Sequence, residues 1–123
     1  MTAINNSNAN TDGRGSAPDF DAKVLEALLD IGGPDMREAL SAQLIADFSR
    51  LQDELKSGDA AVMSSAAHEL KGLAATVGAS RLAEMARSLD GIAKTLPQAA
   101  RAVMAGALDR EITVVLQSLS DAA

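Results

Sequence analysis

Apolar residues recur every three or four positions over most of the chain, and polar residues fill the positions between them. This spacing places the apolar side chains on one face of a helix, so the pattern predicts amphipathic helices and no sheet. The expected apolar stripes are Phe20, Val24, Leu28 and Ile31; Met36, Leu40, Leu44, Phe48, Leu51 and Leu55; Val62, Ala66, Leu70, Leu73 and Val77; Leu82, Met85, Leu89 and Ile92; and Met104, Leu108, Ile112, Val115 and Leu119.

Residue types that favour helix ends stand at the borders of these stripes. Gly32-Gly33 should end the first helix, and Pro34 suits the first position of the second. Asp59 and Ser80 are suited to cap the third and fourth helices, and Pro97 opens the last. Because the connections are short, consecutive helices should be antiparallel neighbours. We therefore expect an all-α fold, an antiparallel four-helix bundle with a short additional N-terminal helix.

The composition supports this fold. The 123 residues are the usual size of one domain, and 25 Ala and 15 Leu outnumber 11 Val plus Ile, which favours helix over sheet. Residues 1–18 are mostly Asn, Ser, Gly and Thr and cannot bury enough apolar surface to offset their ordering entropy. We expect a disordered N-terminal tail over residues 1–18 and a single bundle domain over residues 19–123.

Several classes of protein are disfavoured. The chain has no cysteine and one histidine, so we expect neither disulfides nor a metal site. It has no apolar run of membrane-spanning length and no signal-peptide pattern at its start, so the expected location is the cytoplasm. The net charge of −6, with no cluster of cations, makes nucleic acid a poor partner. No clear dimer seam is present, and we expect a monomer.

The third expected helix carries the only histidine, His68. At about 100° per residue, this residue lies about 200° around the helix from the centre of the apolar stripe. The ring should therefore face solvent, which removes the interpretation of a buried core histidine. Its neighbours within about 60° are small, with a single lysine at the edge, whereas a solvated helix face normally carries several charges. These neighbours are Ala61, Ser64, Ser65, Lys71, Gly72 and Ala75.

Gly72 argues against an idle surface histidine. A glycine inside a helix costs about 1 kcal/mol relative to alanine, and this one lies one turn after His68. A β-carbon there would crowd the approach to the ring. We interpret the small residues as a clearing that lets a second protein reach the imidazole.

An exposed imidazole is mostly unprotonated near pH 7 and has a free ring nitrogen. Within four positions of His68, its own face offers no carboxylate to orient the ring, because Glu69 points about 100° away. A hydrolytic triad or metal enzyme is therefore disfavoured. A nucleophile that accepts a group and passes it on remains, and Lys71 is in range to neutralise an anionic group such as phosphoryl.

These residues resemble a known family. Residues 67–72, Ala-His-Glu-Leu-Lys-Gly, followed by Gly78, Leu82, Leu89 and Asp90, are similar to the histidine-containing phosphotransfer (HPt) domain of multistep phosphorelays. The resemblance covers about residues 19–120. It implies a phosphocarrier, without ATP-dependent kinase activity of its own, that moves a phosphoryl group between receiver-domain aspartates.

The resemblance also implies roles for particular residues. His68 would be the phosphoacceptor, Lys71 its electrostatic partner and Gly72 the clearance residue. Asp90 stands where the family more often has Glu. Arg87 or Lys94 from the next helix would be a further basic neighbour of the phosphate, and the sequence does not choose between them.

The expected partners are receiver domains of response regulators or of a hybrid histidine kinase. The chain itself would bind no cofactor, because the Mg²⁺ would belong to the receiver's carboxylate pocket. Residues 60–94 hold three acidic and four basic residues, against ten acidic and four basic over residues 19–59. The stretch around His68 would therefore be the least repelled by an acidic partner.

Two alternatives stay open. His68-Glu69-Leu70 is also similar to the phosphorylation box of sensor-kinase dimerisation helices, but Gly72-Leu73 follows where that box usually has a small residue and Pro. Self-phosphorylation from ATP is not expected either. The second alternative is a non-catalytic helical interaction module in which His68 is incidental, and it predicts indifference to His68→Gln.

Overall fold

The protein is described by a computed structural model over residues 20–122, and this range is helical, with no strand. The expectation of a disordered tail over residues 1–18 falls outside the described residues. No helix between residues 20 and 122 has the length and apolarity needed to cross a membrane. The elements are α1 (Ala22–Leu29), α2 (Gly33–Leu55), α3 (Ala60–Thr76), α4 (Ser80–Ile92), the short 3-10 helix η1 (Ala93–Thr95) and α5 (Gln98–Ala122).

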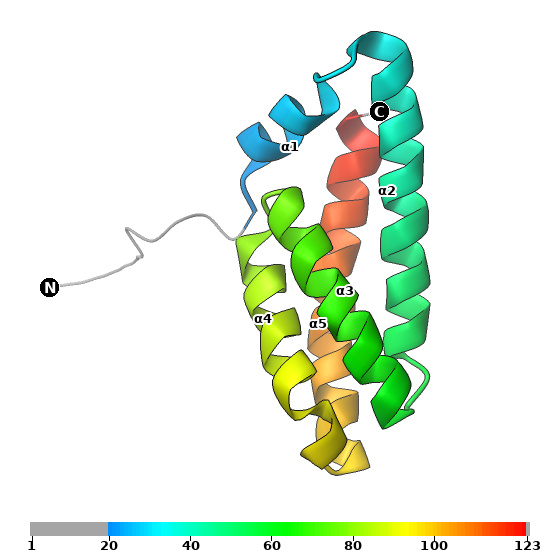
Figure 1. Cartoon of the computed structure of the whole chain (residues 1–123), viewed down its shortest axis with the longest axis vertical. Coiled ribbons are helices and arrows are strands. Elements are labelled where there is room, and N and C mark those ends of the chain that lie inside the picture. Colours follow the sequence, from blue (N-terminus) through cyan, green and yellow to red (C-terminus); the bar gives the residue numbers. More distant parts are fainter. Residues whose placement is uncertain (1–19, 123) are drawn as a thin grey trace, which may run out of the picture.

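The helices α2 to α5 run side by side along the long axis of the molecule, and α1 lies across one end (Figure 1). The most extensive contact is between α3 and α4, and α2 packs against both α3 and α5. Consecutive helices of the bundle run in opposite directions, as short connections require. The predicted all-α four-helix bundle with a short additional helix is confirmed.

The start of α3 is capped as predicted, whereas the start of α4 is not. The Asp59 side chain accepts a hydrogen bond from the backbone N–H of Val62 at 3.0 Å. At α4 the N-cap is Ala79, with no side-chain cap, and Ser80 is already the first helical residue. The tight turn at Gly78, which has a φ of +82°, is followed by Ala79 at the N-cap position, so Ser80 lies one position too late to cap the helix.

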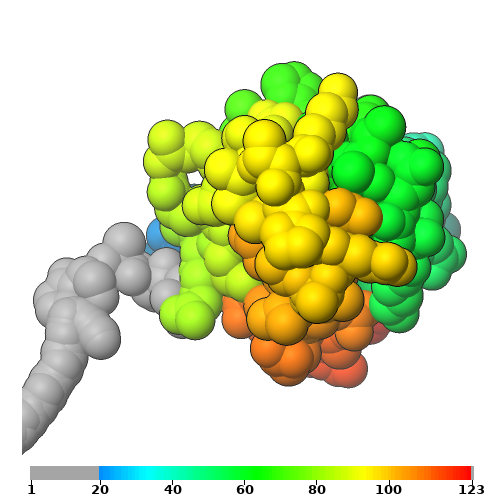
Figure 2. Space-filling model, turned by 90° about the horizontal axis from the view of Figure 1, so that it is seen from below, coloured from blue at the N-terminus to red at the C-terminus, as the bar shows by residue number. Residues whose placement is uncertain are grey.

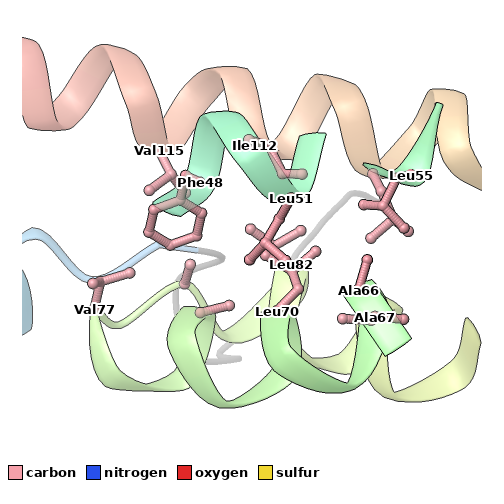
Figure 3. Close-up of a cluster of buried hydrophobic side chains, with 14 of the residues drawn as sticks. Phe48, Leu51, Leu55, Ala66, Ala67, Leu70, Val77, Leu82, Ile112 and Val115 are labelled. Carbon is pink, nitrogen blue, oxygen red and sulfur yellow. The ribbon is translucent and has the colours of Figure 1, made fainter. Parts of the chain in front are cut away.

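The core lies between α2, α3, α4 and α5, and Phe48 is its fully buried aromatic residue (Figure 3). The same buried cluster contains leucines from all five α-helices. The predicted core positions that are buried in the structure are Leu44, Phe48, Leu51, Leu55, Ala66, Leu70, Val77, Leu82, Leu89, Leu108, Ile112, Val115 and Leu119.

Five predicted core residues are instead exposed. Most stand near the ends of helices, and Leu25, Leu29 and Met63, one or two positions along the chain, are buried in their place. Alanines of α3 and α4 outside the predicted stripes are buried as well. Alanine has too little surface to mark a face in the sequence, yet it lets two helices approach closely. The exposed residues are Val24 at 39%, Ile31 at 77%, Met36 at 53%, Val62 at 39% and Ile92 at 42%. The unpredicted buried residues are Leu25, Leu29, Ser41, Met63, Ala67, Ala74, Ala79, Ala86 and Ala93.

The remaining predicted core positions are partly buried and pack against the outside of the core. They are Phe20, Leu28, Leu40, Leu73, Met85 and Met104.

Polar contacts attach the short helix α1 to the rest of the bundle. Arg37 of α2 forms ion pairs of 2.9 Å with Glu26 and with Asp30, and it donates to the carbonyl of Ala122 at 3.0 Å. The backbone N–H of Asp21 donates to the carbonyl of Gly78 at 2.8 Å. The helix α1 is therefore tied to α2, to the end of α5 and to the α3–α4 turn.

Candidate functional site

The side chain of His68 lies on the outer surface of α3 and is 71% exposed. The prediction that the ring faces solvent is confirmed. The buried face of α3 is centred near Met63, Ala67 and Leu70, roughly 60° from the predicted centre. This rotation turns His68 towards the flank of α3 that borders α4.

A carboxylate from α4 meets the ring. His68 Nδ1 lies 3.0 Å from Oδ2 of Asp90, and Nζ of Lys71 lies 3.5 Å from the same oxygen. The Asp90 side chain is 24% exposed, so it is shielded more than the ring that it contacts. The three side chains form one cluster between α3 and α4.

Electrostatics favour the ionised form of Asp90. The hydrogen bond with the His68 ring is the largest cause that lowers the pKa of Asp90, and Lys71 lowers this pKa further. An ionised carboxylate only accepts hydrogen bonds. The proton of a neutral His68 ring therefore belongs on Nδ1, and the lone pair is on Nε2.

The expectation that the face of α3 within four positions of His68 offers no orienting carboxylate is confirmed, because Glu69 points elsewhere and pairs with Arg50 of α2. The orienting group comes instead from another helix, 22 residues along the chain. A signal was present, because Asp90 directly follows the core residue Leu89 and so lies beside the buried face of α4.

The small residues around His68 lie where the sequence placed them. A β-carbon added at Gly72 would meet no atom within 4 Å, so the space above this residue is open. The other members are exposed or, for Ser64, partly exposed: Ala61, Ser64, Ser65 and Ala75.

The two basic candidates of the next helix are not part of the cluster. Arg87 pairs with Glu84 of its own helix at 2.7 Å. Lys94 lies in η1 and is exposed. Within residues 20–122 neither side chain forms a hydrogen bond or ion pair with His68, Lys71 or Asp90.

No group of three or more metal-ligating side chains occurs in the described part of the chain. The cluster at His68 consists of one imidazole, one ammonium and one carboxylate. Its chemistry is that of a nucleophile with a fixed tautomer and a nearby cation.

A helical bundle that exposes one oriented imidazole beside a clearing is the architecture of a phosphotransfer domain. Residues 35–120 match the Hpt domain, so the chain belongs to the Hpt domain family. The helix α1 lies outside this match. The chain is therefore a histidine phosphotransfer protein of phosphorelay signalling, a family of carriers that interact with receiver domains.

The fold is also similar to a solved structure. Histidine-containing phosphotransfer protein B (HptB) from Pseudomonas aeruginosa PAO1 superposes with a TM-score of 0.71 and is 24% identical in sequence. The alignment covers 86% of this chain and 95% of that chain. No curated protein matches the chain at a significant level.

Proposed function

We propose that His68 is the phosphoacceptor and that Nε2 is the atom that carries the phosphoryl group. The observation that carries this proposal is the contact between Nδ1 and Asp90, because it holds the proton on one nitrogen and leaves the other free on the exposed side. The chain has no other histidine.

The bonds formed and broken in the transfer balance without any further group from this chain. The Nε2 lone pair attacks the phosphorus of a receiver's aspartyl phosphate, the N–P bond forms, and the P–O bond to the aspartate breaks. The aspartate leaves as a carboxylate. The ring becomes a phosphorylated imidazolium whose Nδ1 proton stays hydrogen-bonded to Asp90, and transfer to a second receiver reverses these steps.

Lys71 is the proposed electrostatic partner of the phosphoryl group. Its ammonium is 3.5 Å from Asp90 and lies three residues after His68 on the same helix. A lysine at this spacing reaches the space beside the ring, where it would stabilise the added negative charge. Arg87 and Lys94 are proposed to act at longer range, by attracting the acidic receiver pocket.

The small residues are the proposed docking surface. Gly72, Ser64, Ser65, Ala61 and Ala75 leave the ring accessible from the outer side of α3. The Mg²⁺ of the reaction would be held by the partner receiver, which would supply the stabilisation of the transferring group. We further propose that the protein acts as a cytoplasmic monomer without kinase activity of its own.

The test is transfer from a receiver domain charged with radiolabelled phosphate. The wild-type chain should take up an acid-labile, alkali-stable label, and His68→Gln should abolish it. The matched control is Glu69→Gln, which makes a similar change at the next residue, on the side that faces Arg50. This control should keep full labelling.

Two results would contradict the proposal. Labelling that persists in His68→Gln would place the acceptor elsewhere or favour the non-catalytic alternative for this histidine. Labelling of the chain from radiolabelled ATP alone, without a receiver or kinase, would contradict the assignment as a carrier.

A further inference from the structure

The surfaces on the two sides of His68 carry opposite net charge. On the side that faces α2, Glu69 pairs with Arg50. Arg50 also pairs with Glu54 at 3.3 Å and with Asp47 at 3.9 Å. This group holds three carboxylates and one guanidinium, so its net charge is −2. An anion that approached His68 from the α2 side would therefore be repelled.

The other side of His68 is bordered by the flank of α4 that meets α3. Three polar residues each directly follow a buried residue of α4 or η1: Arg87 after Ala86, Asp90 after Leu89, and Lys94 after Ala93. Because successive helical residues are about 100–120° apart, the three polar side chains lie on one flank. Asp90 contacts His68 and Lys71, so this flank faces α3. In Figure 2 the yellow end of α4 and η1 lies beside the green start of α3.

Cations are in excess on this flank. Lys71 pairs with Asp90, and Arg87 pairs with Glu84 at 2.7 Å. Lys94 is exposed and forms no hydrogen bond or ion pair within residues 20–122. Three cations and two carboxylates give a net charge of +1. The α4 side therefore attracts an anion that the α2 side repels.

Gly91 directly follows Asp90 in the last turn of α4 and is exposed. The backbone does not require a glycine here, because Gly91 is not one of the glycines with positive φ. Packing does not require one either, since an added β-carbon would meet no atom within 4 Å. Glycine is also a poor helix former. Gly72 of α3 is open in the same way, so an open glycine lies on each helix beside the contact between His68 and Asp90.

We propose that the receiver docks across the boundary between α3 and α4, with Gly91 as a second clearance residue and Lys94 as a cation that attracts the receiver's anionic group. This inference rests on the proposed role of His68. In that reaction the group that meets Nε2 is an aspartyl phosphate or, in the reverse direction, an aspartate, and both are anions. The charge on the two sides therefore places the receiver over α4 and leaves the α2 side uncovered.

The first test compares two variants that have the same change in charge. Lys94→Glu should slow the uptake of radiolabelled phosphate from a receiver at least about tenfold at low ionic strength, and less in high salt. Lys23→Glu makes the same change at an exposed residue of α1, at the other end of the bundle (Figure 1), and should keep the wild-type rate. Equal rates in the two variants would overturn the role of Lys94.

The second test places the same large side chain at two helical glycines. Gly91→Leu should weaken receiver binding, measured by calorimetry, at least about tenfold, because the side chain would lie where the receiver approaches. Gly106→Leu is the control in α5, where an added β-carbon would meet only the end of the Arg110 side chain at 3.8 Å. This control should bind as the wild type does. Equal affinities in the two variants would overturn the role of Gly91 in clearance.

A third measurement separates this inference from the proposed function. Unlabelled receiver added to the nitrogen-15-labelled chain should shift the NMR amide signals of Gly91 and Lys94 and leave those of Asp47 and Arg50 in place. Shifts on α2 instead of α4, in a chain that accepts phosphate at His68, would overturn the docking inference alone. A wild-type chain that accepts no phosphate from receivers would overturn the proposed function and this inference with it.

Discussion

At the scale of single residues, the central feature is that His68 supplies the nucleophilic nitrogen and Asp90 orients the ring. The His68 side chain is 71% exposed, whereas that of Asp90 is only 24% exposed, between the helices. A shielded, ionised acceptor holds its partner in one orientation better than a solvated one. The exposed Nε2 thus gains a fixed direction without burial of the ring.

Removal of this carboxylate should slow transfer without preventing it. In Asp90→Asn the amide can either accept from Nδ1 or donate to it, and donation selects the tautomer with its proton on Nε2. We expect the rate of phosphoryl uptake to fall about tenfold, since a hydrogen bond to a charged group is lost at a partly exposed site. Rapid-mixing transfer from a labelled receiver measures this rate, and an unchanged rate would remove the orienting role of Asp90.

The same substitution should change how stability depends on pH. The pKa of Asp90 is lowered in the folded protein, chiefly by the hydrogen bond with His68. Its contribution to the free energy of unfolding is therefore present above the unfolded pKa near 3.9 and is lost as the pH falls through the lower folded value. Urea unfolding should show Asp90→Asn less stable than wild type at pH 5, and the difference should shrink as the pH falls below the unfolded pKa. A difference that persists in acid would contradict this origin.

At the scale of helices, the approach of α4 to α3 was harder to predict than either helix alone. The periodicity of Leu82 and Leu89 was sufficient to place α4 and to direct it towards the core. The depth and register of its contact with α3 depend on alanines such as Ala67 and Ala86, whose small side chains leave no clear pattern. Asp90 was therefore part of the motif, but its hydrogen bond with His68 could not be predicted, because it depends on how α4 packs against α3.

The role of the open surface of α3 in receiver binding can be tested by placing a large side chain on it. Gly72→Leu replaces the poorest helix former except proline with a good one, so the helix should gain up to about 1 kcal/mol. The new β-carbon would meet no atom within 4 Å, and the rest of the side chain would extend over the surface one turn from His68. Binding to a receiver domain, measured by calorimetry, should weaken at least tenfold while the melting temperature holds or rises.

The matched control is Ala42→Leu, which places the same side chain on the exposed surface of α2, on the far side of that helix from its core residues. Receiver binding should be unchanged in this variant. If Gly72→Leu bound the receiver as tightly as the control does, the clearing would have no role in docking.

At the scale of the whole molecule, the core and the site are on different faces of α3. Residues such as Leu70 are fully buried, whereas the His68 side chain is 71% exposed on the flank that borders α4. The overall bundle could therefore be predicted from apolar periodicity, and the exposed histidine from its phase. The path of α1 could not, because its attachment depends on polar contacts of Arg37 and on a backbone turn at Gly78 that no periodicity reports.

The attachment of α1 gives a final prediction, based on two glycines with the same backbone strain. Gly78 and Gly33 have φ angles of +82° and +83°, so alanine at either position costs about 1–2 kcal/mol from the left-handed conformation alone. At Gly78 the new β-carbon would also lie 2.8 Å from the carbonyl oxygen of Asp21 and 2.8 Å from Val24, whereas at Gly33 it would meet nothing within 4 Å.

Gly78→Ala should therefore lower the free energy of unfolding by about 1–3 kcal/mol more than Gly33→Ala does, because α1 must shift to admit the β-carbon. Urea denaturation of both variants measures this difference, and hydrogen exchange should show faster exchange at Asp21, whose amide donates to the Gly78 carbonyl. Equal losses of stability in the two variants would mean that α1 does not pack against the α3–α4 turn in solution.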